Sequence, residues 1–243
     1  MNTVIKSSDL TIGIDIGGTK ISAGVVDSSG NIIDSLRIST PAEGGKELIL
    51  AVINLIKELK EKHEIKGIGI SIAALISSDY GTIVGAPNIA NLSKLNFVNE
   101  ISKEFKLPLI VENDANAAMW AEFKFGNAKG CNPVMFFIIG TGVGGGLVID
   151  GKLFKGATGI GAEFGHMCVV PNGLLCGCGS RGCIEQYASG GALIRYANEA
   201  IIDNPQSSET LLSFGEGKLS GTALTKAAKA GNELALAAFS KQA

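Results

Sequence analysis

Four side chains that can bind a metal ion follow one another in a short stretch of the sequence. They are one imidazole and three thiols, His166, Cys176, Cys178 and Cys183, in the spacing H-x9-C-x-C-x4-C. This is the ligand set of a closed tetrahedral Zn²⁺ site, which is usually structural. Glycines between the thiols permit tight turns around an ion. The pattern predicts a structural zinc site, with a redox-inert cysteine cluster or a disulfide pair as the alternative.

Two carboxylates flank this cluster. Glu163 lies three residues before the histidine, and Glu185 lies two residues after the last thiol. A zinc-bound loop would hold both near each other, and paired carboxylates on a rigid loop can bind the hydroxyls of a polyol. Five cysteines leave an odd one, which disfavours a disulfide framework. Cys131 and Cys168 fall outside the pattern, and we expect them to be buried small apolar side chains.

The composition is that of an ordinary soluble globular protein. The 243 residues suffice for one or two domains with a sizeable core, and 46% are hydrophobic and 18% charged. The net charge of −2 gives no sign of nucleic acid or an anionic membrane as a partner. The N-terminal segment MNTVIKSSDL has no apolar run of signal-peptide length, and no stretch approaches the length of a membrane span. Reduced thiols suit a reducing compartment, so we expect a cytoplasmic protein.

A glycine-rich turn is predicted between the first two strands. Gly17, Gly18, Thr19 and Lys20 follow the apolar run 11–16, in which Asp15 stands near the end. Backbone N–H groups of such a turn can face a phosphate, and the threonine adds a hydroxyl. The aspartate can hold Mg²⁺ through water. The alternative is that this segment is only a hairpin turn.

An aspartate follows a later predicted strand. Asp114 comes after the apolar strand 109–112 and before an alanine-rich helix that runs to Phe125. Ligand sites of α/β proteins gather at the carboxyl ends of strands, so this carboxylate can serve as a general base for a substrate hydroxyl. Aspartate is also a favoured helix N-cap, and both roles can hold at once.

The strand, turn and strand of the N-terminal segment have a counterpart later in the chain. A predicted strand at 133–139 leads into the glycine-rich turn 140–146, which contains Thr141 and Gly142, and a strand follows at 147–149. The sequence therefore predicts an internally duplicated fold with a phosphate-binding turn in each half. A nucleoside triphosphate between the halves is the expected ligand.

The remaining elements are predicted from apolar periodicity and complete an α/β layer. The strand 65–76 is almost unbroken in its apolar character, which indicates burial on both faces. A polar turn is predicted at 77–81 and loops at 86–89 and 204–221, the last without a motif. The last three helices are expected to be scaffold. Further strands are predicted at 21–27, 32–38 and 82–84, and helices at 47–61, 98–105, 192–202, 222–230 and 233–240.

Four landmarks stand in order: DIGGTK, ENDANAA, GTGVGGG, and GAEFGH with CGCGSRGCIEQYASG. Over about Thr11 to Tyr196 they resemble the ROK family of sugar kinases, most closely its bacterial ATP-dependent glucokinases. The resemblance implies a duplicated actin-like or hexokinase-like (ribonuclease H-like) α/β fold, with two domains around a cleft, here 1–113 and 114–243. It implies ATP, Mg²⁺ and a hexose phosphorylated at its 6-hydroxyl, and a homo-oligomer, dimer or tetramer.

The resemblance also implies roles by position. Asp114 would be the base that takes the proton from the sugar 6-hydroxyl. The sugar contacts would be Asn113, Asp114, Glu163, His166 and Glu185, with His166 also a zinc ligand. The residues along the nucleotide and its Mg²⁺ would be Asp15, Gly17, Gly18, Thr19, Lys20, Thr141 and Gly142.

Two departures from the family pattern bear on these roles. Relatives usually have glycine where Ala74 stands, and a methyl group there can crowd the sugar. Relatives also continue through a further glycine-rich segment and a final helix, so we expect the C-terminal domain to be short at its end. The alternatives are N-acetylmannosamine, fructose or allose as substrate, polyphosphate as donor, and a non-catalytic sugar-binding protein. A sugar-responsive regulator is disfavoured, because no helix-turn-helix precedes DIGGTK.

Overall fold

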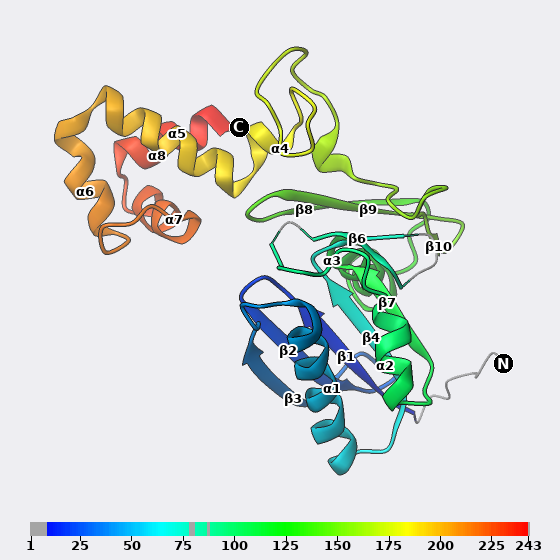
Figure 1. Ribbon diagram of the computed structural model, residues 1–243. Coiled ribbons are helices and arrows are strands. Elements are labelled where there is room, and N and C mark those ends of the chain that lie inside the picture. The colour runs from blue at the N-terminus through cyan, green and yellow to red at the C-terminus, as the bar shows by residue number, and fades with distance from the viewer. Residues whose placement is uncertain (1–8, 78–80, 87, 243) are drawn as a thin grey trace. The chain divides into compact units, whose positions relative to one another are not determined.

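The computed structural model describes residues 9–77, 81–86 and 88–242 (Figure 1). The predicted turn 77–81 and the predicted loop 86–89 extend outside these described residues. Within the described part of the chain, no helix is both long and apolar enough to cross a membrane.

The chain divides into two compact units. The first unit comprises Met1–Phe136 and Gly146–Ala162, and the second comprises Phe137–Gly145 and Glu163–Ala243. The predicted division after Asn113 falls within the first unit, between a strand and the helix that follows it. As a functional boundary it stays a prediction.

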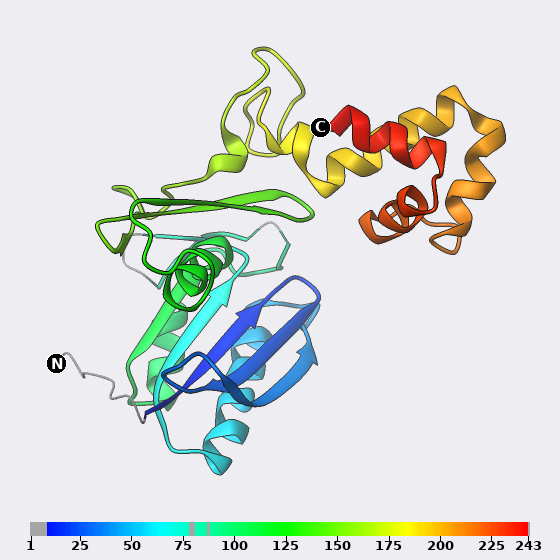
Figure 2. The ribbon, with the colours of Figure 1, turned by 180° about the vertical axis from the view of Figure 1, so that it is seen from behind.

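Five strands form the main sheet of the first unit, in the order β3-β2-β1-β4-β7. β1, β2 and β3 are an antiparallel meander, whereas β4 runs parallel to β1 and β7 parallel to β4. Helices α1 (Gly45–Lys62) and α2 (Phe97–Glu104) lie on one face of this sheet (Figures 1 and 2). The strand bounds are β1 Leu10–Ile16, β2 Lys20–Val26, β3 Ile32–Ser39, β4 Ile65–Ile72 and β7 Leu109–Asn113.

The core of the first unit follows from the two periodicities of the sequence. On β1, Ile12, Ile14 and Ile16 are buried while Asp15 between them is exposed, as alternation along a strand requires. The apolar stripe predicted for the first helix is buried throughout, which confirms that prediction. Its members are Leu48, Val52, Leu55, Ile56 and Leu59.

The predicted strand 65–76 is wrong in its last part. β4 ends early, and β5 (Leu75–Ile76) pairs instead with β6 (Ile83–Gly85) in a separate two-stranded sheet. The chain bends at Ala73 and Ala74, where the Ala73 N–H donates to a carbonyl of β1. An almost unbroken apolar run does not indicate where a strand ends, because the residues before and after the bend are equally apolar.

A second meander repeats the arrangement of β1, β2 and β3, with strand order β10-β9-β8. The turn is shorter than predicted, because β9 begins at Val143 and takes in residues assigned to the glycine-rich turn. Glycine is depleted in strands, which concealed this. Positive φ angles at Asp150 and Gly151 agree with the predicted hairpin. The bounds are β8 Val134–Ile139, β9 Val143–Ile149 and β10 Lys152–Leu153.

Helices dominate the second unit, where α5 packs along α8 around Leu193, Tyr196 and Leu234. The predicted loop 204–221 is wrong in part, because it contains two helical segments. Only one residue of α6 is buried, so no apolar stripe revealed it. The helical bounds are η1 Phe164–His166, α4 Glu185–Ala188, α5 Gly190–Asp203, η2 Pro205–Ser207, α6 Ser208–Ser213, α7 Gly221–Lys229 and α8 Glu233–Gln242.

Candidate active site and metal centre

The carboxyl ends of three parallel strands bring two aspartates close to each other. In the register of β1, β4 and β7, Asp15 stands opposite Ser71, and Ser71 stands opposite Glu112. The Ser71 hydroxyl donates to the Asp15 carboxylate at 2.9 Å. Asp114 opens helix α3 (Asp114–Phe125) directly after β7. The sheet edge at which α/β proteins bind ligands therefore carries the carboxylates of both aspartates.

The surroundings of Asp114 suit a base. Burial raises the pKa of its carboxyl group, and the negative charge of Asp15 raises that pKa further. Hydrogen bonds from the Ala115 backbone N–H, at 2.9 Å, and from the Asn113 amide, at 3.1 Å, oppose this rise. A carboxylate with a raised pKa is a stronger proton acceptor once it is ionised.

The N-cap of α3 is Asn113, so the prediction of Asp114 as N-cap is wrong. The Asn113 Oδ1 accepts the backbone N–H groups of Ala115 at 3.0 Å and Asn116 at 3.1 Å. Its Nδ2 donates to the carbonyl of Ala74 at 3.2 Å and to Asp114. Capping thus falls to the neighbour, and Asp114 occupies the first helical position with its carboxylate held by the Asn113 amide.

The first glycine-rich turn, Gly17–Lys20, is closed and braced by neutral groups. The Gly17 N–H donates to the Lys20 carbonyl at 3.0 Å. Thr40 braces the turn from the end of β3: its N–H donates to the Thr19 carbonyl at 3.1 Å, and its hydroxyl donates to the Gly17 carbonyl at 2.7 Å. The side chains of Thr19 and Lys20 are exposed.

The second glycine-rich turn joins β8 to β9 and is fastened to the start of α5. The Gly140 N–H donates to the Gly142 carbonyl at 3.0 Å. From α5, the Gly190 N–H donates to the Gly140 carbonyl at 2.8 Å and the Gly191 N–H to the Thr141 carbonyl at 3.2 Å. Thr141 is exposed, as a phosphate contact requires.

A carboxylate also braces the second turn. Glu185 Oε2 accepts the backbone N–H of Val143 at 3.0 Å. A Cβ placed on Gly142 would lie 2.4 Å from the same oxygen, so the carboxylate fills the space that a side chain would need. The sugar contact predicted for Glu185 does not include this bond to the turn. The one signal for it was the glycine itself.

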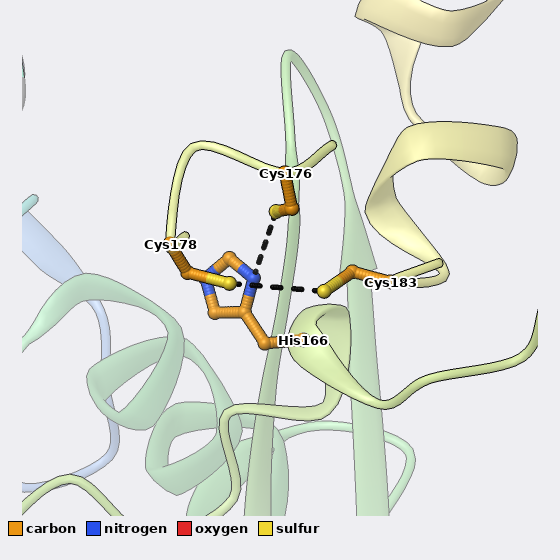
Figure 3. A group of neighbouring side chains, drawn as sticks. All are labelled: His166, Cys176, Cys178 and Cys183. Carbon is orange, nitrogen blue, oxygen red and sulfur yellow. Dashed lines mark hydrogen bonds between the residues drawn. The ribbon is translucent and has the colours of Figure 1, made fainter. Parts of the chain in front are cut away.

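The predicted metal ligands converge in the second unit. The candidate ligand atoms of His166, Cys176, Cys178 and Cys183 all lie within 4.8 Å of one another (Figure 3). The two sulfurs of Cys178 and Cys183 are 3.7 Å apart, and Cys176 Sγ is 3.5 Å from His166 Nδ1. A tetrahedron with Zn–S about 2.3 Å and Zn–N about 2.0–2.1 Å has edges of about 3.8 Å and about 3.6 Å. The cluster fits zinc.

The thiols are not paired as disulfides. All five cysteines lie in the described part of the chain and are free. Burial raises the pKa of the Cys183 thiol to about 12, whereas the backbone N–H of Ser180 lowers the pKa of Cys178. A cysteine binds a metal ion as the thiolate, so the buried Cys183 would lose its proton when it binds the cation. Cys131 and Cys168 are exposed, which corrects the expectation of burial, because both lie in irregular surface segments.

The candidate residues are shared between the two units. Within the first, the structure brings Asp15 near Asp114; within the second, it brings Glu185 to the turn and His166 to the thiols. Glu163 lies just before η1, where its carbonyl accepts the His166 N–H at 3.0 Å. The first unit holds Asp15, Gly17, Gly18, Thr19, Lys20, Asn113 and Asp114, and the second holds Thr141, Gly142, Glu163, His166, Cys176, Cys178, Cys183 and Glu185.

A hollow of about 570 Å³ in the second unit adds residues that sequence reasoning left as scaffold. Its volume is typical of small-molecule sites. The polar members on α7 recur at i, i+3, i+4 and i+7, one face of a helix, and that spacing was a signal in the sequence. The lining residues are Gly140, Leu193, Gly221, Thr222, Thr225, Lys226 and Lys229.

Comparison with known proteins gives consistent matches over three quarters of the chain or more. The sequence profile of the ROK family matches residues 11–243. A glucokinase of Streptomyces coelicolor is 43% identical over 233 residues, 95% of this chain and 73% of the relative. An N-acetylmannosamine kinase of Yersinia pseudotuberculosis is 38% identical over 182 residues, 75% of this chain and 62% of the relative.

A solved structure agrees with these sequence matches. The crystal structure of a ROK family glucokinase from Streptomyces griseus, in complex with glucose and AMPPNP, superposes with a TM-score of 0.82 at 42% identity. The match covers 96% of this chain and 75% of that one. The predicted actin-like, hexokinase-like fold class is thereby confirmed.

Proposed function

Since the chain belongs to the ROK family, we propose that it is an ATP-dependent glucokinase. It would transfer the γ-phosphoryl group of ATP to the 6-hydroxyl of glucose, releasing ADP. The observation that carries the proposal is the Asp114 carboxylate at the strand ends, whose pKa is raised by partial desolvation and by Asp15 beside it. Glucokinases among the similar proteins support glucose as the substrate.

In this reaction the oxygen of the sugar 6-hydroxyl attacks the γ-phosphorus while Asp114 accepts the hydroxyl proton. The bond between the γ-phosphorus and the bridging oxygen breaks, and its electron pair leaves with ADP. Asn113 holds the carboxylate in place through its amide. Asp15 supplies the hard oxygen that Mg²⁺ prefers, directly or through water, and is oriented by the Ser71 hydroxyl. Mg²⁺, when bound, neutralises phosphate charge.

The sugar would be held by Asn113, Glu163, His166 and Glu185. His166 turns Nδ1 toward the thiols, which leaves Nε2 for a substrate hydroxyl. Ala74 is 4% exposed and belongs to the hydrophobic core of the first unit. Its methyl group is therefore a poor reason to expect a sugar other than glucose.

The nucleotide phosphates would lie along both turns, at Gly17, Gly18, Thr19 and Lys20 and at Thr141 and Gly142. The hollow beside α7 is lined by Gly140 of the second turn as well as by α7, and it would take the nucleoside. Zinc at the Cys3His cluster would be structural, because four protein ligands leave no open position. A cytoplasmic location and a homo-oligomer stay predictions of the thiol chemistry and the resemblance.

The test is ADP release by this chain with Mg-ATP, with and without glucose. Glucose-dependent release supports the proposal, and release equal to the sugar-free rate contradicts it. A panel of N-acetylmannosamine, fructose and allose then tests the sugar, and N-acetylmannosamine deserves inclusion because one relative is a kinase of that name. Polyphosphate in place of ATP tests the donor.

A further inference from the structure

Glu185 is held between the metal cluster and the second turn. It opens α4 two residues after Cys183, and the backbone around it is fixed: the Gln186 N–H donates to the Cys183 carbonyl at 2.9 Å, and the Ile184 N–H to the Met167 carbonyl at 2.9 Å. Its side chain is half-buried. The position of the carboxylate is therefore set by the loop that carries the thiols.

The two oxygens of this carboxylate differ. Oε2 accepts the Val143 N–H and lies against Gly142, whereas among the described residues no hydrogen bond involves Oε1. The three heavy atoms nearest to a Cβ built on Gly142 all belong to Glu185, at 2.4, 3.3 and 3.9 Å. Gly142 has no positive φ, so its backbone suits any residue and only this carboxylate excludes a side chain.

We propose that Glu185 is a positioning residue that couples the sugar to the phosphate turn, Oε1 accepting a sugar hydroxyl while Oε2 fixes the Val143 N–H. This inference rests on the proposed function, which gives the sugar and the phosphates their places. A carboxylate fixed by the sugar can no longer rotate away from Val143, so the turn is ordered before the nucleotide arrives. Ordering in advance lowers the entropic cost of binding. By linkage, the nucleotide must strengthen sugar binding by the same factor.

The readout is a coupling factor, the ratio of the AMPPNP dissociation constants without and with saturating glucose, measured by calorimetry with Mg²⁺. We expect at least about 5-fold in the wild type, the low end of common allosteric couplings. Gly142→Ala keeps the carboxylate but displaces it, so the factor should fall to within about 2-fold of unity. Gly69→Ala is the matched control, because a Cβ there meets nothing within 4 Å and its φ is not positive.

A double-mutant cycle shows whether the contact is the cause. Gly142→Ala should lower the Tm by about 3 °C or more in the wild type and by less than about 1 °C in a Glu185→Ala background, where the obstructing oxygens are gone. Glu185→Gln keeps one oxygen for the Val143 N–H, and its NH2 group can donate to the sugar hydroxyl where Oε1 accepts from it, so part of the coupling should remain. Glu185→Ala should abolish the coupling, even at glucose concentrations that restore saturation.

The outcomes separate this inference from the proposed function. A wild type that binds glucose and AMPPNP with a coupling factor of one overturns the inference and leaves the kinase standing. The same holds if Glu185→Ala retains full coupling, or if Gly142→Ala costs as much with Glu185 absent. A wild type that binds no AMPPNP and releases no ADP overturns the proposed function, and the coupling with it.

Discussion

The two glycine-rich turns have similar sequences and equivalent places in duplicated meanders, but different supports. The turn Gly17–Lys20 is braced by Thr40, a neutral residue at the end of the same meander. The turn after β8 is braced by Glu185 and by the start of α5, which lie more than forty residues further along the chain. The hydrogen bonds that brace the first turn come from its own meander, whereas those that brace the second come from a distant loop that carries a metal cluster and from the helix after it.

The difference indicates that the turn was preserved after duplication, whereas the groups that brace it diverged. A neutral brace holds the backbone without any effect on the charge of the site. A carboxylate holds it at the cost of a negative charge close to the proposed phosphate position, a repulsion that a structural brace alone does not need. This repulsion is explained if the carboxylate also binds the sugar, as proposed above.

The largest expected effect comes from a residue in neither turn. Asp114→Asn should lower kcat by about 10²- to 10⁴-fold, the usual worth of a general base. Both turns stay intact, so the dissociation constants for glucose and AMPPNP should change by less than about 3-fold. Near-normal turnover would remove Asp114 as the base, and a large loss of AMPPNP binding would mean that the turns are not independent of it.

The pH dependence of the same residue has a definite sign. The base acts when ionised, and burial and Asp15 raise its pKa. The acid limb of kcat/KM should therefore lie above the ordinary aspartate value of about 3.9. The stability that Asp114 contributes is complete below its unfolded-state pKa and is lost as the pH rises through its folded-state pKa. Asp114→Asn should abolish that loss in a Tm-against-pH series.

The next effect separates the two turns by their dependence on the metal. Cys178→Ser should weaken zinc binding by at least about 100-fold, since it removes a direct ligand where loss of an outer partner costs about 10- to 100-fold. The second turn should lose order and the first should not, which hydrogen exchange at Val143 and Thr40 can report. Cys131→Ser, outside the cluster, is the control. A metal-free wild type by elemental analysis would refute the zinc site.

A smaller effect compares the turns directly. Thr19→Val and Thr141→Val each remove one exposed hydroxyl proposed to face a phosphate. A hydrogen bond to a charged group contributes about 1.5–3 kcal/mol, so the AMPPNP dissociation constant should rise about 10- to 100-fold. Glucose binding should change far less. Equal losses for sugar and nucleotide would count against the phosphate assignment of that turn.

The smallest effect concerns the neutral brace. Thr40→Val keeps the shape of the side chain and removes its 2.7 Å bond to Gly17. Such a bond contributes about 1 kcal/mol, so the free energy of unfolding should fall by that amount in urea titration and AMPPNP should bind about 5-fold more weakly. The coupling factor should not change. A loss of coupling here would show that both turns respond to the sugar.

The predictions that the structure confirms rest on local signals. The alternation on β1, the stripe on α1 and the Cys-x-Cys spacing each lie within one short segment and were found in the structure. Their side chains face the same way because of the period of the element that holds them. The two turns were likewise found at the strand ends, although their braces were not.

The failures have physical causes. The bend after Ile72 was not predicted because the residues on both sides of it are apolar. Helix α6 was not predicted because only Leu211 is buried, so the helix has no apolar stripe. Asn113 and Asp114 are adjacent and have nearly equal N-cap preferences, so the sequence did not show that Asn113 is the N-cap of α3. The bond from Val143 to Glu185 joins residues that no local pattern connects.

The close packing of Glu185 against Gly142 also has a consequence for how this protein can evolve. A side chain at position 142 fits only if the residue at position 185 is shorter than glutamate. A shorter residue at position 185, however, loses the hydrogen bond from the Val143 N–H that braces the turn. Each single substitution is therefore expected to be harmful, and only the two substitutions together are expected to be tolerated. The two positions should therefore change together among descendants of this sequence, as one inherited unit.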